Sequence, residues 1–290
     1  MTVIIPILNL SMKQNVTAFL IASFLLQGCY HYAYYVSPFD SNNSTYHTIP
    51  LRSDSVTSAL FISGSLISGM ANEQGEGDGD GVYDFHTNIY RTHNLGFLEL
   101  FYGLDLTLGN YSISKYDSVG NSYTVNYRII NKNAGNKFFG GIGLNAGFDF
   151  AIPLGRSEWR IGMDISGHNE FGSYSKFRNQ LPDSAATFIV RDPSLVTISF
   201  TSEFAFRTRH GSWGFKLMSG KVLNASYEQV YESLFQESHS FYNSSFTFQY
   251  SYEKYTAYFM ESASPLSFSI QLGCNYRISK KKKNPLTNLY

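Results

Sequence analysis

Long runs of strictly alternating apolar and polar residues constrain this chain more than any other feature. They occupy residues 95–109, 138–152, 158–168, 194–208 and 265–278. In the second run, Leu144, Ala146 and Phe148 alternate with Asn145 and Gly147. Because successive side chains of an extended chain point to opposite faces, each run predicts a β-strand with one apolar and one polar face.

The length and composition of these strands indicate a membrane barrel. The runs have ten or more residues, whereas strands of soluble proteins usually have about five or six. Ten residues tilted by about 45° span roughly the 25 Å apolar band of an outer membrane. Aromatic residues stand near the ends of the apolar faces, as in interfacial girdles: Trp159, Trp213, Phe138 and Tyr276. Only 15% of all residues are charged and 17% are aromatic, which suits a lipid-facing surface.

The polar faces are rich in glycine and small polar residues, which suits a narrow lumen. The sequence therefore predicts an all-β fold, namely an antiparallel up-and-down transmembrane β-barrel of 8–12 strands over residues 55–279. The segments 123–130 and 244–260 each have the pattern of a further hairpin, and no amphipathic helix of useful length is expected.

Connections between the predicted strands alternate in length. The tight ones are 153–157 and 209–212, and the long ones are 71–81, 110–137, 168–193 and 220–243. Outer-membrane barrels have short periplasmic turns and long outer loops. This parity predicts an even strand number and an N-terminus on the side of the tight turns, in the periplasm.

The N-terminus has the features of a secretory signal. The apolar run 16–26 is too short to span a bilayer as a helix, Lys13 precedes it, and Met12 is a candidate start. The run ends in Leu26–Cys29 (Leu-Gln-Gly-Cys), which resembles the lipobox of bacterial lipoproteins. The resemblance implies cleavage after residue 28 and lipidation of the Cys29 thiol, which adds membrane affinity. The alternative is an ordinary secretory signal that happens to contain a cysteine.

The remaining organisation follows from these segments. Residues 1–28 are the predicted signal peptide, 30–54 a linker without apolar period, and 280–290 a basic tail. The strand ending at 276–278 resembles the C-terminal strand by which outer-membrane proteins are recognised for assembly. The predicted partners are therefore the lipid bilayer and the assembly machinery, and the predicted location is the bacterial outer membrane, with a lipid anchor. A net charge of zero gives no argument for a nucleic-acid partner.

Charged residues of both signs fall on the faces assigned to the lumen. The negative ones are Glu99, Asp105, Asp149, Asp164 and Glu203, and the positive ones are Arg128, Arg160, Arg207, Lys216 and Arg277. A selective pore usually shows a bias toward one sign. Because buried charges need partners, the balanced set predicts a paired network that fills a narrow barrel.

Two further motifs suggest chemistry. Glu76, Asp78, Asp80 and Asp84 have the oxygen spacing of an EF-hand-like calcium loop without its closing glutamate. The alternative is a flexible acidic outer loop, and no other cofactor is expected. Ser166 and His168 resemble, in reverse order, the His-x-Ser pair of outer-membrane lipid hydrolases. No oxyanion donor or third residue accompanies them, so a polar pair near a loop is expected instead of catalysis.

Four functions fit these features. The leading hypothesis is a lipidated outer-membrane barrel with a structural or surface-interaction role through long outer loops, and not an enzyme. The alternatives are a small-solute channel, a lipid-modifying enzyme, and a soluble periplasmic lipoprotein whose lipocalin-like barrel has its apolar face inside. The sequence predicts no particular external ligand or partner protein.

Overall fold

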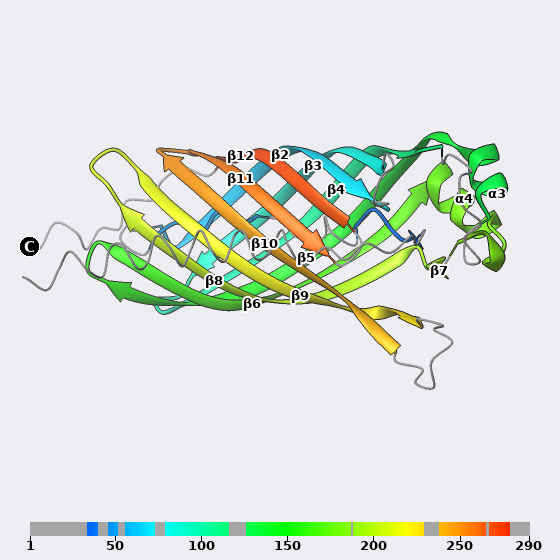
Figure 1. Ribbon diagram of the computed structural model, residues 1–290. Helices are drawn as coiled ribbons and strands as arrows, with labels where there is room; N and C mark the ends of the chain where they lie inside the picture. Colours follow the sequence, from blue (N-terminus) through cyan, green and yellow to red (C-terminus); the bar gives the residue numbers. More distant parts are fainter. Residues whose placement is uncertain are drawn as a thin grey trace, which may run out of the picture.

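The structure is a computed structural model. It describes residues 34–39, 46–51, 56–72, 79–115, 126–186, 188–228, 238–264 and 267–278. Ten long strands form one barrel (Figure 1). Their bounds are β2 Ser58–Ala71, β3 Asp80–Asn94, β4 Leu98–Ile113, β5 Gly135–Leu154, β6 Ser157–Gly172, β8 Ser194–Arg207, β9 Ser212–Glu228, β10 Ser238–Tyr252, β11 Tyr255–Ser264 and β12 Ser267–Arg277.

The barrel is closed, and every neighbouring pair of its strands is antiparallel. The order around the wall is β10-β11-β12-β2-β3-β4-β5-β6-β8-β9, and β9 pairs with β10. The last strand closes the wall on the first, with Ser267 opposite Ala71 and Arg277 opposite Phe61. The predicted antiparallel up-and-down barrel is therefore confirmed, and its ten strands lie within the predicted range. The hairpin expected at 244–260 is also confirmed, as β10 and β11.

The β3–β4, β5–β6, β8–β9 and β10–β11 turns lie at one end of the barrel, the tight-turn end, and the long connections lie at the other, the long-loop end, which also holds the short connection between β11 and β12. At the long-loop end stand the helices α3 (Tyr127–Asn133) and α4 (Ser173–Gln180), the 3-10 turn η2 (Asp183–Ala185) and a small parallel sheet of β1 (Tyr34–Tyr35) and β7 (Phe188–Ile189) (Figure 1). The hairpin expected at 123–130 is wrong, because residues 127–130 begin α3, which Asn126 caps by accepting from the Ile129 amide at 3.3 Å. The connections with helices were not foreseen, since both helices are too short to show a period. Within the described part of the chain, no helix has the length and apolar character needed to cross a bilayer.

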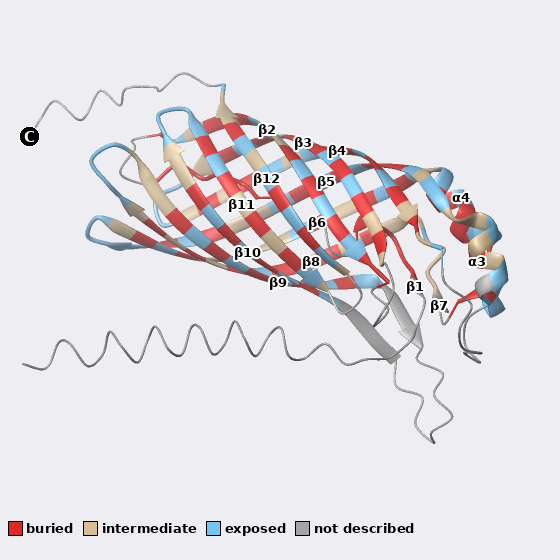
Figure 2. Ribbon diagram, turned by 45° about the horizontal axis from the view of Figure 1, so that its top comes forward, coloured by how far each residue is buried: buried red, intermediate tan, exposed pale blue. Residues whose placement is uncertain are grey.

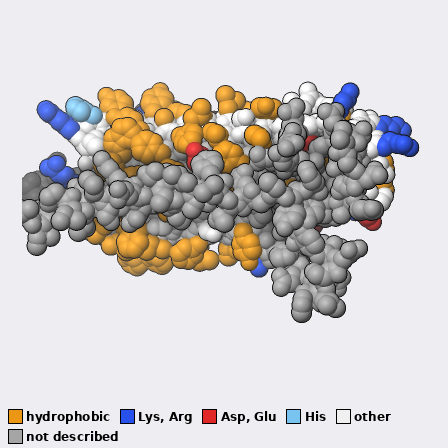
Figure 3. All heavy atoms as spheres, viewed as in Figure 1, with side chains coloured by type: hydrophobic (Ala, Val, Ile, Leu, Met, Phe, Trp, Pro, Cys, Tyr) orange, Lys and Arg blue, Asp and Glu red, His pale blue; other side chains and the backbone are white. Residues whose placement is uncertain are grey.

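Burial alternates along the barrel strands wherever the structure describes it (Figure 2). The apolar face points outward, and Leu104 and Leu144 stand opposite one another with 59% and 64% of their surface exposed. Hydrophobic side chains cover the barrel wall, and Lys and Arg gather at its two ends (Figure 3). The lipocalin-like alternative is wrong, because it needs the apolar face inside. Such a wall fits the acyl chains of a bilayer.

Aromatic side chains flank the apolar band at both ends. Near the tight turns, Trp213 packs on Tyr250 with ring centroids 4.3 Å apart. Near the long loops, Phe138 packs on Phe171 at 6.4 Å. These positions are those of interfacial girdles, where amphipathic rings contact headgroups and the ends of acyl chains. The predicted girdle positions of Trp213 and Phe138 are therefore at the expected ends.

Charge placed in the middle of this band is expected to destabilise the protein strongly. For Leu144→Arg, in the middle of β5, we expect a loss of about 2–4 kcal/mol of folding free energy in lipid vesicles. The matched change Leu154→Arg, beside the tight turn, is expected to cost about 0–1 kcal/mol because the guanidinium reaches headgroups. Reversible urea unfolding in vesicles measures both values. Equal costs at the two positions would contradict the depth assigned to Leu144.

Candidate functional site

Part of the predicted linker lies inside the barrel. Residues 34–39 and 46–51, here called the luminal segment, contact side chains of the inner face along its length. Tyr34 and Tyr35 add a strand to β7 at the long-loop end, where the Val190 amide donates to the Tyr35 carbonyl at 3.0 Å. The Tyr34 amide donates to Asn72 Oδ1 at 2.6 Å. The sequence predicts an N-terminus at the end of the tight turns, and β2 does begin there, but Tyr34 lies at the opposite end.

A buried ion pair holds the luminal segment below this small sheet. The Ser37 hydroxyl donates to Glu170 Oε2 at 2.8 Å, and Arg178 of α4 also donates to the Glu170 carboxylate. All three side chains are buried. Because the pair joins β6, α4 and the luminal segment, it ties the cap of long loops to the contents of the lumen.

Phe39 fills a space that a glycine leaves open. Its ring stacks on His168, with centroids 5.4 Å apart, and meets Phe139 edge-on at 5.7 Å. A Cβ atom at Gly141 would lie 2.3 Å from the Phe39 ring. A side chain at position 141 is therefore incompatible with this ring position, which explains a glycine on the luminal face of a barrel strand.

The second part of the luminal segment packs between rings deeper in the barrel. His47 lies between Tyr90 and Phe101, with ring centroids 4.7 and 4.5 Å away. The Thr48 amide donates to the Tyr90 hydroxyl at 2.9 Å, and Asn275 Nδ2 donates to Thr48 Oγ1 at 2.6 Å. These contacts come from β3, β4 and β12, so this part of the chain is held from several sides of the lumen.

The luminal segment then reaches the tight-turn end. Arg160 Nη2 donates to the Pro50 carbonyl at 3.3 Å. Leu51 lines a polar hollow of about 260 Å³ whose other walls come from residues at the tight turns. These are Arg207, Thr208, Arg209, Gly211, Ser212, Ser251, Glu253 and Arg277. The described residues of the segment therefore extend from one end of the barrel to the other.

Arg160 is the centre of a buried charge cluster beneath Pro50. Its guanidinium lies 2.9 Å from Glu99, 2.7 Å from Glu158 and 3.4 Å from Glu203. The Arg160 side chain is 1% exposed, so the pairing takes place away from bulk water. Arg160, Glu99 and Glu203 were predicted as members of one network, and the structure brings them together. Glu158 was missed, although it shares the face of Arg160 two residues away.

A second polar cluster surrounds Asp105 about half-way along β4. His86 Nε2 lies 3.1 Å from the carboxylate, His168 Nε2 lies 4.0 Å from it, and Asn88 and Asn145 donate to it. The carboxylate is thus enclosed by neutral or weakly basic donors and not by arginine. Sequence reasoning placed Asp105 on the inner face but missed these partners. They come from β3, β5 and β6, and the sequence of one strand does not show the register of its neighbours.

The other predicted network residues lie elsewhere. Asp149 of β5 accepts from the Thr201 hydroxyl at 3.0 Å. Asp164 lies on the inner face of β6 and is half-buried. Arg207 and Arg277 lie at the tight-turn rim, where Arg277 Nη2 donates to the Glu253 carbonyl at 3.3 Å. Lys216 is buried with its ammonium 5.9 Å from the Phe101 ring centroid, whereas Arg128 is exposed on α3, outside the lumen.

The predicted calcium ligands do not form a loop in the described residues. Asp80 and Asp84 lie in the extended β3, where four residues span about 13 Å. The Asp80 carboxylate accepts from Asn72 at 2.8 Å, from Tyr111 at 3.0 Å and from the Ser114 amide at 2.8 Å. Protein donors thus occupy the place of a cation there. Glu76 and Asp78 lie outside the described residues, and calcium binding stays a prediction.

The other predicted positions are the Ser166–His168 pair and the two cysteines. Ser166 and His168 are buried on the inner face, and His168 is covered by Phe39, so the pair does not open to the bilayer. Cys274 is free and exposed on the outer face, as its strand pattern predicts. Cys29 lies outside the described residues, so its lipidation stays a prediction. No group of three or more metal-ligating side chains with suitable geometry occurs among the described residues.

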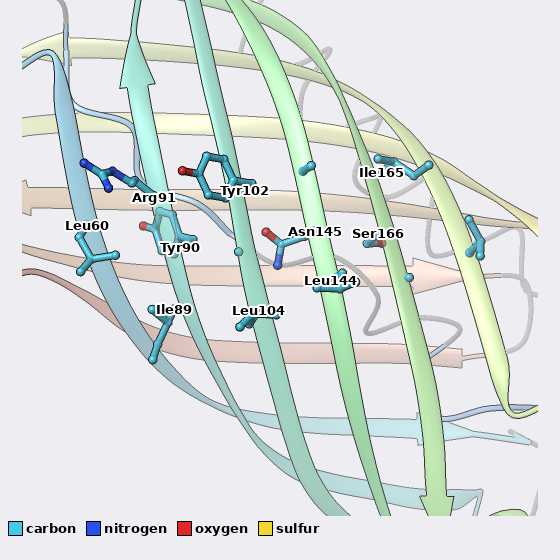
Figure 4. A pocket seen from close by; sticks show the side chains of 14 residues that line it. Leu60, Ile89, Tyr90, Arg91, Tyr102, Leu104, Leu144, Asn145, Ile165 and Ser166 are labelled. Atoms are coloured by element: carbon cyan, nitrogen blue, oxygen red, sulfur yellow. The ribbon is translucent and has the colours of Figure 1, made fainter.

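A hollow of about 690 Å³ lies on the outer face of the wall (Figure 4). Its lining includes larger apolar side chains of neighbouring strands, such as Leu104 and Leu144, and the small residues Gly103, Ala146 and Gly167. On a lipid-facing surface such a depression is filled by acyl chains, so it does not by itself indicate a specific ligand.

No protein-family profile matches the chain, and no curated protein matches it. Similar solved structures include the β domain of the Bordetella autotransporter BrkA, with 10% identity, a TM-score of 0.43 and coverage of 77% of this chain and 100% of that one. An outer membrane channel from Pseudomonas putida F1 has 11% identity, a TM-score of 0.39 and coverage of 84% and 100%. Neisserial surface protein A has 7% identity, a TM-score of 0.31 and coverage of 77% and 97%. Such values are too low to indicate a function.

Proposed function

We propose that this protein is a bacterial outer-membrane β-barrel lipoprotein whose lumen is closed by its own N-terminal segment. Its role is structural or one of surface interaction, exerted through the long-loop end. The observation that carries the proposal is the luminal segment itself. It occupies the interior that a channel needs, while the described elements outside the barrel wall, α3, α4 and the β1–β7 sheet, lie at the long-loop end.

The charges of the lumen support a closed interior. Arg160 is surrounded by three carboxylates within 3.4 Å, and the Asp105 carboxylate is enclosed by histidine and asparagine side chains. A conducting path needs charged groups that face water and passing ions. Charged groups that are paired with one another on neighbouring strands of the inner face are not available to water or passing ions in this way.

The lipid anchor and the outer-membrane location are parts of the same proposal. The apolar wall and its aromatic girdles require a bilayer. The Leu-Gln-Gly-Cys motif at residues 26–29 supports lipidation of Cys29. Metabolic labelling with a fatty acid tests the anchor independently of the barrel. The label should be found on the unmodified protein and be absent from Cys29→Ser.

A small-solute channel is the second candidate. One observation favours it. The described contacts that hold the luminal segment are hydrogen bonds and ring packing, and the segment is joined covalently to the wall where the chain continues into β2. Such a segment could leave the lumen without breaking the wall. In this case the closed state seen here would be one of two states.

Planar-bilayer recording of the purified full-length protein separates the two functions. We expect no resolved conductance steps, because the luminal segment occupies the interior and the charges around Arg160 and Asp105 are paired with one another. An empty-bilayer recording and a porin of known conductance are the controls. Stable, frequent openings of the unmodified protein would overturn the structural role in favour of the channel.

A further inference from the structure

The luminal segment changes the end of the barrel at which the N-terminal part of the chain emerges. β2 begins at the tight-turn end, where the Asn94 amide beside a tight turn donates to the Thr57 carbonyl at 2.9 Å. Going backward along the chain, Leu51 is still at this end, His47 is deeper inside, and Tyr34 is at the long-loop end. The chain therefore crosses the barrel before it enters the wall.

We propose that the chain before Tyr34 emerges on the exterior side of the outer membrane, so that a lipid on Cys29 is anchored in the outer leaflet. The inference rests on the proposed function for the orientation of the barrel, with long loops outside. It goes further, because an ordinary lipid-anchored barrel whose N-terminus stays with the tight turns would carry its lipid in the periplasmic leaflet.

The short length of chain between Cys29 and Tyr34 decides in which leaflet a lipid on Cys29 can be anchored. Four residues lie between Cys29 and Tyr34, and the five residue-to-residue steps of an extended chain reach about 18 Å at most. A strand of fifteen residues tilted by about 40° gives the wall a height of roughly 38 Å. The thiol of Cys29 therefore cannot return to the tight-turn end. From the lumen of a ten-stranded barrel, about 18 Å is enough to pass over the rim to the surrounding outer leaflet.

The exit is built into the cap of long loops. β1 pairs with β7 in parallel, with Tyr34 opposite Phe188 and Tyr35 opposite Ile189. The Tyr174 hydroxyl of α4 donates to the Val36 carbonyl at 3.0 Å. Strand addition of this kind uses main-chain hydrogen bonds, which fix the direction of the added chain. The segment thus leaves the lumen in a defined direction and on one side.

The residues of the luminal segment that follow Tyr34 are also held by side-chain contacts inside the barrel. Tyr35 is fully buried and packs edge-on against Phe177 of α4, with centroids 5.3 Å apart. The Ser37–Glu170 hydrogen bond and the Phe39–His168 stack follow within four residues. This density of contacts is that of a packed core, so the crossing is part of the folded state and not one position of a loose tail.

Surface labelling of intact bacteria tests the proposal. Three versions of the full-length protein carry the same short epitope, after Tyr30, after Asn179 near the end of α4, or after Gly155 in a tight turn. We expect antibody to bind the first two on intact cells and the third only after the outer membrane is permeabilised. Heat-modifiable gel mobility confirms that each version folds.

A second version uses a smaller probe in case the epitope disturbs folding. In a Cys274→Ala background, Ala33→Cys is treated with a membrane-impermeant maleimide, and Ser173→Cys and Arg156→Cys are the exterior and periplasmic references. A lipidated Cys29 has no free thiol, so the background alone should stay unlabelled. We expect labelling at positions 33 and 173 on intact cells and none at 156.

The outcomes separate this inference from the proposed function. Exterior labelling at α4 together with N-terminal labelling only after permeabilisation would overturn the crossing and leave the barrel orientation intact. Labelling at α4 only after permeabilisation, with the tight turn exposed on intact cells, would overturn the orientation and with it the proposed function. Exterior labelling at both sites supports the inference.

Discussion

Deletion of residues 34–51 should turn a silent barrel into a conducting one. The luminal segment spans the barrel from Tyr34 to Leu51, and its removal leaves the wall strands untouched. The space freed along the lumen fills with water, which lets small ions pass the remaining side chains. We expect the mean current in planar bilayers to rise by roughly an order of magnitude or more over the full-length protein.

A substitution in the wall gives the same test with the whole chain present. In Gly141→Val the new side chain takes the place of the Phe39 ring, which lies 2.3 Å from a Cβ atom at this position. We expect residues 34–39 to lose protection from proteolysis and brief openings to appear. Gly167→Val is the matched control, because a Cβ atom there points to the outer face and its nearest neighbour is 4.0 Å away.

Heat-modifiable mobility shows whether each variant keeps its barrel. A folded deletion variant that stays silent would contradict the view that the luminal segment is what closes the lumen. Closure would then have to come from the wall side chains alone, among them the buried Arg160, Tyr90 and Phe101. The two results lead to different assignments of the residues that block the barrel.

The wall could be predicted from the sequence because its information is local. A period of two over ten residues defines a strand, its two faces and, with loop lengths, its direction. The outer face of β5 and the inner face carrying Asp149 were assigned correctly in this way. The same reasoning found the hairpin of β10 and β11, whose apolar positions also alternate.

The luminal segment could not be predicted, because its contacts have no period. His47 lies between rings of β3 and β4, and Thr48 bonds to β3 and β12, which are distant in the sequence. Each of these residues alone is typical of a linker. One signal was present: Gly141 leaves space on an inner face, and in a closely packed interior such a gap is filled by another side chain, here Phe39.

The sequence predicted on which face of its strand each charged residue lies, but not its position along the barrel axis. Arg160, Arg207 and Arg277 all alternate onto the inner side of their strands, yet Arg160 is buried among three carboxylates whereas Arg207 and Arg277 line the polar hollow at the rim. The difference comes from position along the barrel axis, since Arg207 and Arg277 end their strands at the rim. Which carboxylates meet Arg160 depends on the register of β4, β6 and β8, which is a property of the closed wall.

Replacing Arg160 with methionine is expected to cost about 3–5 kcal/mol of folding free energy, because it leaves buried carboxylates without their partner. Glu99, Glu158 and Glu203 all lie within 3.4 Å of its guanidinium and are at most 6% exposed. Arg156→Met, in an exposed tight turn four residues away, is the control and should change stability by less than about 0.5 kcal/mol. Urea unfolding in vesicles, followed by the fluorescence of the two tryptophans, measures both.

Partial rescue distinguishes lost charge pairing from lost packing. In Arg160→Met, adding Glu203→Gln removes one uncompensated negative charge and should recover part of the lost stability. Lowering the pH should also recover part of it, because protonation of the remaining carboxylates removes their charge. A loss that neither change reduces would mean that Arg160 acts through packing and its bond to the Pro50 carbonyl. In that case the luminal segment, and not the three carboxylates, would be the partner that Arg160 mainly supports.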